Sequence, residues 1–594
     1  MNTIIERLSA LRQEMARMDV QAYIVPTSDF HDTEYVCDYF KSRNYISGFS
    51  GSAGVVVVCE NCAALWTDGR YFIQAARELE GSGIELMKQG VEGTPSIEEY
   101  IIENVKPNQT VGFDGRTIST MAAKQYKNVF GLHDIKIAAE MDLIGNIWAD
   151  RPALPATQTF HYDEKYCGKS MTEKLADVRE KMKSVGAKEH VITKIDEVAW
   201  LYNLRARDIP SFPVALAYAI VTLEDSTIYM DASRLDEVSK KLFAENNVNV
   251  KGYNDIYEDV KTLAGPVLVC PAYVNSTLYW SMDCEIIEGL DPIVLMKSMK
   301  NEVELANTRE AHIKDAVACT KFMYWLKHNV GKIDMTEVSA ENYLMDLRKQ
   351  QEGYIEDSFK TISAYRENAA MMHYKANTEN PVPLKPEGML LVDSGGHYLE
   401  GTTDITRTYV LGPITEEEKF WFTKALRGHI RLERAKFLYG CHGYNLDILT
   451  RGPLWELGMD YQCGTGHGVG HLLSVHEAPN GVRWRIVPEL LDSAVLEEGM
   501  IQSDEPGVYE EGKFGIRHEN EMVCHKAEKN KYGQFMEFEC LTFVPFDLDG
   551  VDKSLMMDDE IEWLNNYHKE VYEKVAPRLT EEEAAWLKEV TRAI

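Results

Sequence analysis

A faint internal repeat at an offset of 167 residues constrains the fold of this chain most strongly. Residues 8–15 recur as 175–182, and in each copy a short apolar segment follows, at 22–25 and at 190–192. Each copy has the pattern of an amphipathic helix, a buried strand, a second helix and a hairpin, which together form an α/β module. The repeat therefore predicts one α/β module used twice. Chance similarity between two helix–strand patterns is the alternative.

The segments outside the repeat divide the rest of the chain. Residues 150–157 contain two prolines and have no hydrophobic periodicity, which is typical of a linker. Asn301, with Glu304 three residues later, has the capping pattern of a long helix that continues to about His328. Beyond residue 301 long helices alternate with β-rich stretches over a length too great for a third copy. The sequence predicts two related α/β modules at 1–150 and 151–300 and a larger α+β domain at 301–594.

The charge balance disfavours several classes of partner. The chain has 63 Lys and Arg against 94 Asp and Glu, a formal net charge of −31, and such a surface repels phosphate backbones. No apolar run approaches the roughly 20 residues that cross a bilayer, and the N-terminal segment lacks the pattern of a signal peptide. Eleven cysteines without framework spacing fit reduced thiols. We expect a cytoplasmic protein that binds neither nucleic acid nor membrane.

One cysteine pair has the CxxC spacing of a redox or zinc motif. Cys59 and Cys62 lie between two apolar runs, so they are predicted to flank the turn between two strands. No second pair or nearby histidine completes a four-ligand zinc site. A hairpin turn that contains two thiols is the favoured interpretation.

Two aspartates are expected to face each other across a hairpin. The strand at 389–392 ends in Asp393, and after a turn near 398–401 the chain returns through Asp404. Side chains on neighbouring strands lie about 5 Å apart, and two carboxylates that close do not both stay ionised without a cation between them. Two aspartates at loop edges, without a metal, are the alternative at this stage.

Further candidate ligands follow in the last third of the chain. Three histidines, His467, His471 and His476, lie within ten residues among glycines, which leave room for another group to approach the rings. Glu505 and Glu519 each lie at the end of a predicted strand. The order Asp, Asp, His, Glu, Glu supplies oxygen-rich ligation suited to two hard divalent cations.

At this point the chain resembles a known family. The matching segments are Trp66-Thr-Asp-Gly-Arg-Tyr71, Met372-His-Tyr374, Val392-Asp-Ser-Gly395, Gly401-Thr-Thr-Asp-Ile-Thr-Arg-Thr408, Gly464-Thr-Gly-His-Gly-Val-Gly470, Val475-His-Glu477 and Asp504-Glu-Pro-Gly507. They resemble the metallopeptidase clan with the pita-bread fold, and within it the Xaa-Pro aminopeptidases (aminopeptidase P). The tail at 562–568 resembles the C-terminal extension of the long, three-domain cytosolic form.

The resemblance implies the architecture and the metal site. Two creatinase-like modules would precede a pita-bread catalytic domain. Asp393 would bind one metal, His467 and Glu505 the other, and Asp404 and Glu519 would bridge the two. Two divalent ions per subunit are implied, with manganese the expected metal and zinc or cobalt as alternatives. The family also implies a homodimer.

The resemblance further implies the residues that act on the substrate. His373 and His476 would hydrogen-bond the scissile carbonyl and the intermediate, and His467 would lie in the same substrate-binding site. Arg70 would contact the substrate from the first module. Glu505 is the candidate for passing a proton to the departing proline nitrogen.

Two positions depart from the family pattern. His518 stands where the family commonly has isoleucine before the last ligand. On a strand it should point away from Arg517 and Glu519, which share the other face, so a structural role is favoured over ligation. His471 stands where the long form often has a small residue, and its role stays open.

The predicted function is hydrolysis of the first peptide bond of small peptides with proline at the second position, by attack of a metal-bridging hydroxide on the scissile carbonyl. The nearest alternative is a prolidase, which is restricted to Xaa-Pro dipeptides. A methionine aminopeptidase lacks the long front half, and creatinase-like hydrolases do not need the five ligands. A non-catalytic pita-bread binding module is the remote alternative, because such modules lose the ligands. The preferred first residue and the physiological peptides stay open.

Overall fold

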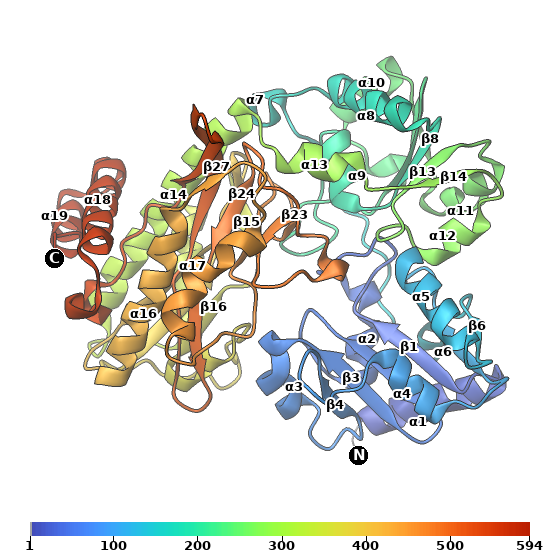
Figure 1. Cartoon of the computed structure of the whole chain (residues 1–594), viewed down its shortest axis with the longest axis horizontal. Coiled ribbons are helices and arrows are strands. Elements are labelled where there is room, and N and C mark those ends of the chain that lie inside the picture. Colours follow the sequence, from blue (N-terminus) through green and yellow to red (C-terminus); the bar gives the residue numbers. More distant parts are fainter. Residues whose placement is uncertain (1–2) are drawn as a thin grey trace. The chain divides into compact units, whose positions relative to one another are not determined.

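The chain folds into two compact units in the computed structural model, which describes residues 3–594 (Figure 1). The first unit runs from the N-terminus through Asp163 and includes Lys169–Ile293. The second consists of Glu164–Gly168 and Val294–Ile594. The first predicted α/β module and most of the second belong to the first unit. Residues 164–168 and 294–300 of the second predicted module belong to the second unit, together with the predicted larger domain.

The two modules contain sheets with the same strand order, which confirms the repeat. In the first module the order is β4 (Glu85–Lys88), β3 (Ala63–Thr67), β2 (Val55–Cys59), β1 (Ala22–Pro26), β5 (Thr110–Phe113) and β6 (Lys136–Ala138). In the second it is β12 (Val248–Lys251), β11 (Ser226–Tyr229), β10 (Tyr218–Thr222), β8 (Glu189–Ile192), β13 (Val267–Val269) and β14 (Ile286–Glu288). The strands that come first along the chain, β1 and β8, take equivalent places: each is antiparallel to one neighbour and parallel to the other.

Helices accompany both sheets. The first module has α1 (Thr3–Arg17), α2 (Ser42–Ser47), α3 (Phe72–Glu78), α4 (Ile97–Asn104), α5 (Thr120–Gly131) and α6 (Leu143–Ile147). The second has α8 (Met171–Val185), α9 (Ile195–Leu201), α10 (Glu237–Glu245), α11 (Ile256–Asp259), α12 (Ser276–Ser281) and α13 (Pro292–Ser298), with a short pair of strands, β7 (Phe160–His161) and β9 (Leu204–Arg205). The predicted linker has no helix or strand over residues 151–157.

The first module is buried on both faces of its sheet because successive side chains of a strand point to opposite sides. Tyr23 and Val25 of β1 pack in one hydrophobic core with Leu11 of α1. Ala22 and Ile24 pack in a second core, together with residues of α4 and α5. Helices that cover both faces explain why β1 is a continuous apolar run in the sequence.

The second unit is built around antiparallel sheets. The largest has the order β21 (Lys436–Leu438), β28 (Gly533–Cys540), β27 (Asn520–Asn530), β24 (Ile501–Asp504), β22 (Gly466–Gly468) and β23 (Glu477–Val482). The smaller sheets are β16 (Ile362–Tyr365), β17 (Met389–Ser394) and β20 (Ile405–Val410); β15 (Tyr354–Asp357), β18 (Gly396–Tyr398) and β19 (Gly401–Thr402); and β25 (Gly507–Glu510) with β26 (Phe514–Arg517).

Long helices pack around these sheets and share one hydrophobic core with β17 and β20. They are α14 (Glu302–Asn329), α15 (Glu337–Lys349), α16 (Glu416–Glu433), α17 (Gly443–Trp455), α18 (Asp558–Val575) and α19 (Glu581–Val590), with α7 (Glu164–Cys167) nearby in the same unit. The predicted helix after residue 301 is confirmed, because the Asn301 side chain accepts from the Glu304 N–H and caps α14.

The cysteine pair of the CxxC motif lies in a hairpin. Cys59 and Cys62 flank the turn between β2 and β3, where the Cys59 N–H donates to the Cys62 carbonyl, and both thiols are free. The hairpin interpretation of the CxxC motif is thus confirmed. Across residues 3–594, the structure contains no helix with the length and apolar character that a membrane crossing requires.

Candidate metal centre

The two predicted aspartates lie on one antiparallel hairpin, but not directly opposite each other. β17 pairs with β20 so that Asp393 faces Thr406, and Tyr398 faces Gly401 at the turn. Because only Leu399 and Glu400 form the turn, the register is displaced by two residues from the one that the sequence suggested. Asp404 therefore lies diagonally from Asp393, immediately before β20.

His467 is placed by β22, a short strand between β23 and β24. Its neighbours must be glycine, because a Cβ atom at Gly466 would lie 1.9 Å from the Ser503 carbonyl oxygen and one at Gly468 would lie 2.3 Å from the Glu477 carbonyl oxygen. The backbone N–H of His467 donates to Ser503 Oγ. The glycines therefore permit the close strand approach that holds the ring.

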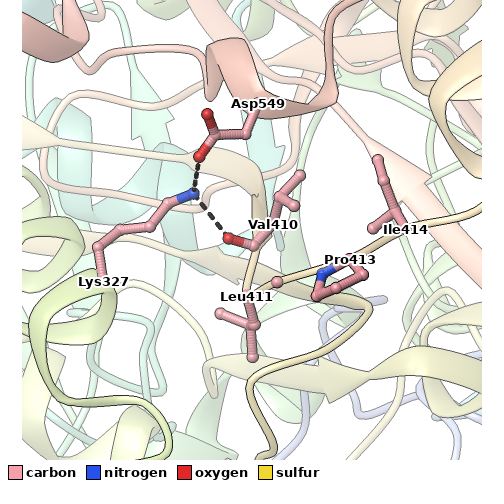
Figure 2. A pocket seen from close by; sticks show the side chains of 7 residues that line it. Lys327, Val410, Leu411, Pro413, Ile414 and Asp549 are labelled. Carbon is pink, nitrogen blue, oxygen red and sulfur yellow. Dashed lines mark hydrogen bonds and ion pairs between the residues drawn. The ribbon is translucent and has the colours of Figure 1, made fainter.

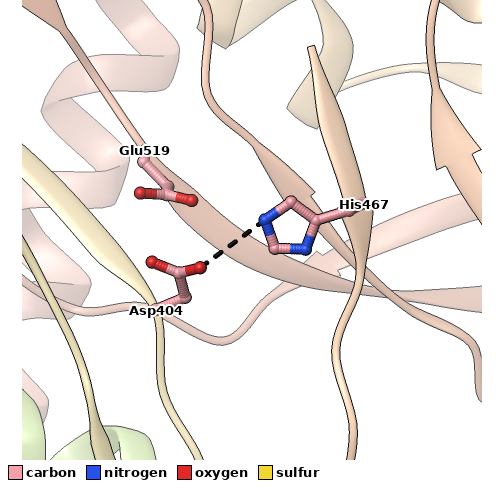
Figure 3. A group of neighbouring side chains, drawn as sticks. All are labelled: Asp404, His467 and Glu519. Atoms are coloured by element: carbon pink, nitrogen blue, oxygen red, sulfur yellow. Dashed lines mark ion pairs between the residues drawn. The ribbon is translucent and has the colours of Figure 1, made fainter. Parts of the chain in front are cut away.

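Carboxylates from separate segments meet this ring. Figure 3 shows the carboxylates of Asp404 and Glu519 facing the ring of His467. One ligand atom of each of the three residues lies within 4.8 Å of the others. His467 Nε2 lies 3.6 Å from Asp404 Oδ2 and 3.2 Å from Glu505 Oε1. Glu505 follows β24, and Glu519 precedes β27.

Asp393 joins the same charged cluster through its neighbours. Its Oδ2 accepts from the guanidinium of Arg517, which also contacts Thr406 Oγ1, and that hydroxyl donates to Glu519 Oε2 at 2.7 Å. The other oxygen, Asp393 Oδ1, is buried without a hydrogen-bond partner among the described residues. A buried carboxylate oxygen without a donor is what a cation ligand would leave in a metal-free structure.

The electrostatics of the cluster favour a cation. Burial, together with Glu519 and Asp393, raises the pKa of Asp404 well above its ordinary value. Burial and Glu505 likewise raise the pKa of Glu519 well above its ordinary value. Burial raises the pKa of Asp393 against the opposing effect of Arg517. Divalent cations would relieve this repulsion, so the donor set fits hard metal ions.

In Glu505 and His467 the pKa shifts favour the charged forms instead. Although burial opposes it, the hydrogen bond from His467 lowers the pKa of Glu505 to about 2. Burial lowers the pKa of His467, but the contact with Glu505 outweighs this effect and raises it overall. Without a metal, these shifts favour the charged forms of Glu505 and His467 and the protonated forms of Asp404 and Glu519.

These shifts predict how the stability of the metal-free protein depends on pH. Carboxyls with raised folded-state pKa values bind protons that the unfolded chain has already released, so the free energy of unfolding falls as the pH rises above about 4. Metal binding must displace the same protons, so its stabilising effect should grow with pH. Thermal unfolding should be measured on chelated and on manganese-loaded protein between about pH 5 and 8, a range around the ordinary titration of histidine. The difference in melting temperature between the two samples should widen as the pH rises. A constant difference would contradict the assignment.

The predicted substrate residues lie as follows. The ring of His476 contacts that of His467 edge to face, with centroids 4.3 Å apart. His373 is half-buried in the loop before β17, next to Met372, whose carbonyl accepts from Arg517. Arg70 belongs to the first unit, where its guanidinium binds Asp68. The structure thus brings His476 to the metal cluster and His373 to its Arg517 edge.

His518 and His471, the two residues that depart from the family pattern, make their contacts away from the proposed metal ligands. His518 Nε2 contacts the Phe422 carbonyl oxygen of α16, whereas Arg517 and Glu519 both reach Thr406 on the other side, as strand alternation predicted. His471 contacts Thr308 Oγ1 at 3.1 Å through Nδ1 and the Tyr166 carbonyl oxygen at 3.0 Å through Nε2. Both histidines therefore have structural contacts.

Several residues of the site were missed in the sequence. Glu521 accepts from the Asp404 N–H at 2.6 Å and lies 3.2 Å from His312. A second buried cluster joins His429 and Glu433 with Asp504, the residue that precedes Glu505. The i, i+4 spacing of His429 and Glu433 on a helix was the available signal.

A separate cavity of about 460 Å³ contains none of the predicted site residues (Figure 2). Its lining residues are Lys327, Val410, Leu411, Gly412, Pro413, Ile414 and Asp549. Lys327 is already bound to Asp547, Asp549 and the Val410 carbonyl. The cavity is therefore not a second candidate for the active site.

Models of known families match nearly the whole chain. Residues 7–144 and 150–304 each match a creatinase/prolidase N-terminal domain. Residues 306–526 match metallopeptidase family M24, and residues 534–594 match the C-terminal region of peptidase M24. The predicted succession of two creatinase-like modules and a metallopeptidase domain is confirmed.

Individual proteins match over similar lengths. Aminopeptidase P2 of Arabidopsis thaliana is 37% identical, over 97% of this chain and 86% of its own. Xaa-Pro aminopeptidase 1 of Dictyostelium discoideum is 36% identical, over 98% of this chain and 96% of its own.

Solved structures agree with these relatives. The X-prolyl aminopeptidase of Caenorhabditis elegans, described as a cytosolic enzyme with a di-nuclear active site, superposes with a TM-score of 0.95, 33% identity and full coverage of both chains. The Xaa-Pro dipeptidase of Bacillus anthracis shares only the fold, with a TM-score of 0.51 and 21% identity over 64% of this chain and 99% of its own. The chain therefore belongs to the Xaa-Pro aminopeptidases of metallopeptidase family M24.

Proposed function

We propose that this protein removes the first residue from small peptides that have proline at the second position, with two divalent metal ions, manganese foremost, held by Asp393, Asp404, His467, Glu505 and Glu519. One observation carries the proposal. Four carboxylates and one imidazole from separate segments converge in a mostly buried cluster, and burial together with neighbouring carboxylates raises the pKa values of Asp404 and Glu519. The length and identity of the relatives favour this activity over a prolidase.

The chemistry of the substrate explains the need for such a site. A peptide bond before proline has no N–H, so recognition through that group is impossible. Two bound cations would lower the pKa of a water molecule and polarise the carbonyl group.

The protein's own side chains would perform the remaining tasks. Glu505, whose Oε1 lies 3.2 Å from His467 Nε2, is placed to accept a proton and pass it to the proline nitrogen. His373 and His476 would donate hydrogen bonds to the carbonyl oxygen as charge develops on it. His467, between Glu505 and His476, would border the bound peptide. Arg517 holds Asp393, and we assign Arg70 to contact with the substrate.

Two substrates and a chelator test this function. The purified protein should release arginine from Arg-Pro-Pro, lose the activity after chelation and regain it with manganese. Arg-Pro should be hydrolysed at least about tenfold less efficiently, because the dipeptide forfeits binding energy from its missing third residue. Equal or better hydrolysis of Arg-Pro would instead support a prolidase. Metal analysis of the native protein identifies the ion, with zinc and cobalt as the alternatives to manganese.

We also propose that the enzyme is a homodimer. The metallopeptidase unit exposes several large apolar side chains, those of Trp455, Leu457, Trp484, Ile486 and Leu490. The two indole rings are 6.4 Å apart and edge to face. Clustered exposed aromatic side chains are typical of protein interfaces. Sedimentation should give twice the 67.6 kDa of one chain, and a single-chain mass at micromolar concentration would refute the dimer.

The expected location is cytoplasmic. The C. elegans relative is described as cytosolic, and within residues 3–594 none of the eleven cysteines forms a disulfide. Fractionation of cells that express a tagged chain tests this location.

A further inference from the structure

A buried ion-pair cluster lies beside the proposed metal centre, and neither the ligands nor the proposed oxyanion donors account for it. The Glu477 carboxylate contacts two ammonium groups, those of Lys297 and Lys300, and its Oε2 lies 2.9 Å from Lys297 Nζ. The three side chains are at most 3% exposed. Taking these charges out of water is unfavourable unless each is closely paired, so their geometry is tightly defined.

Glu477 is joined to the segments that carry two site histidines. It directly follows His476 and begins β23, and its Cα partner is Gly468, the neighbour of His467 on β22. A Cβ atom at Gly470 would lie 3.2 Å from Glu477 Oε2. The carboxylate therefore packs against the glycine-rich segment that carries His467.

The lysines belong to a segment that also contacts a ligand-bearing strand. Lys297 lies in the last turn of α13, and the Lys300 N–H donates to the Gly499 carbonyl at 3.0 Å. The adjacent Met299 forms an isolated bridge with Met500. Met500 directly precedes β24, after which Glu505 follows. One short segment, 297–300, is thus bound to the strands of His476 and Glu505.

Net stability alone does not explain such a cluster. Well-packed apolar residues of similar volume often stabilise a buried position as well as an ion pair does, but they lack its directionality. We propose that Glu477 is a positioning residue, and that its ion pairs with Lys297 and Lys300 hold His467 and His476 in register for the reaction. This inference rests on the proposed function, and it adds residues that touch neither metal nor substrate.

Replacement of Glu477 tests the proposal. Glu477→Gln should lower kcat about 10–100-fold, as is common when supports of metal ligands are lost, while KM changes much less. The same variant, stripped of metal, should bind manganese more weakly in calorimetry, because β22 carries His467. Glu477→Asp keeps the charge and should recover part of the loss. Unchanged kcat and manganese affinity in folded Glu477→Gln would overturn the proposal.

A matched control exists in the same unit. Glu560 is buried and forms ion pairs with two arginines of α16, Arg427 at 2.6 Å and Arg431 at 3.0 Å. It does not contact the proposed metal ligands. Glu560→Gln should lower the melting temperature but leave kcat and manganese affinity unchanged. An equal loss of kcat in both variants would show a general effect of destabilisation and overturn the positioning role.

An apolar replacement separates positioning from stability if Glu477→Gln does not fold. The triple variant K297M/E477M/K300M removes all three charges and approximately keeps their volume, so it should fold. Its kcat and manganese affinity should still fall, because no directional contact holds β23. Full activity would overturn the proposal. If the wild-type protein itself does not cleave Xaa-Pro peptides, the proposed function fails, while manganese affinity still tests Glu477 independently.

Discussion

His467→Ala should abolish both metal binding and hydrolysis of Xaa-Pro peptides. Its imidazole lies within 3.6 Å of Asp404 and 3.2 Å of Glu505, so it is the nitrogen donor at the centre of the carboxylate cluster. Loss of a group that merely supports a ligand costs about 10–100-fold, and loss of the ligand itself should cost more. The measurements are metal content after dialysis and kcat with excess manganese. Asp404→Ala should behave in the same way.

His471→Ala is the matched control for this prediction. It removes a buried imidazole four residues after His467, but that ring contacts Thr308 and Tyr166. We expect lower thermal stability and intact metal content. Full activity in His467→Ala, or equal metal loss in His471→Ala, would refute the ligand assignment.

His373→Ala should lower kcat by about 10²–10³-fold and leave the metal content unchanged, because loss of one oxyanion donor has an effect of this size. The residue lies in the loop next to Met372, and the Met372 carbonyl contacts Arg517 at the edge of the cluster. Metal analysis and steady-state kinetics on the same sample measure both quantities.

The control for His373 is an exposed histidine of the same unit. His328, on α14, contacts only its own helix turn and aromatic neighbours in the contacts described, so His328→Ala should leave kcat unchanged. If His373→Ala lost its metals, the residue would be a ligand or a support of one. If it kept full activity, the oxyanion role would be wrong.

Local patterns were enough to predict most of the fold. The Asn301 and Glu304 pattern marked the start of α14 because a side-chain cap depends only on residues three positions apart. The repeat marked two modules because helix and strand periodicities survive in both copies, and the two sheets have the same strand order.

Long-range register was less predictable. The sequence indicated a hairpin that carries Asp393 and Asp404, but a turn displaced by one residue changes every cross-strand partner by two. The structure pairs Asp393 with Thr406 instead. Thr406 then becomes the hydroxyl that links Arg517 and Glu519, a contact that no local pattern predicts.

The sequence by itself determined the residue types of the candidate site, their order along the chain and the family to which the chain belongs. Only the tertiary structure decided which groups support them, such as Arg517 on Asp393 and the lysines on Glu477. The physical reason is that ligand chemistry is a property of individual side chains. Buried charge pairing depends on distance and burial. These arise only when segments far apart in the sequence come together, such as Lys297 and Glu477, which are 180 residues apart.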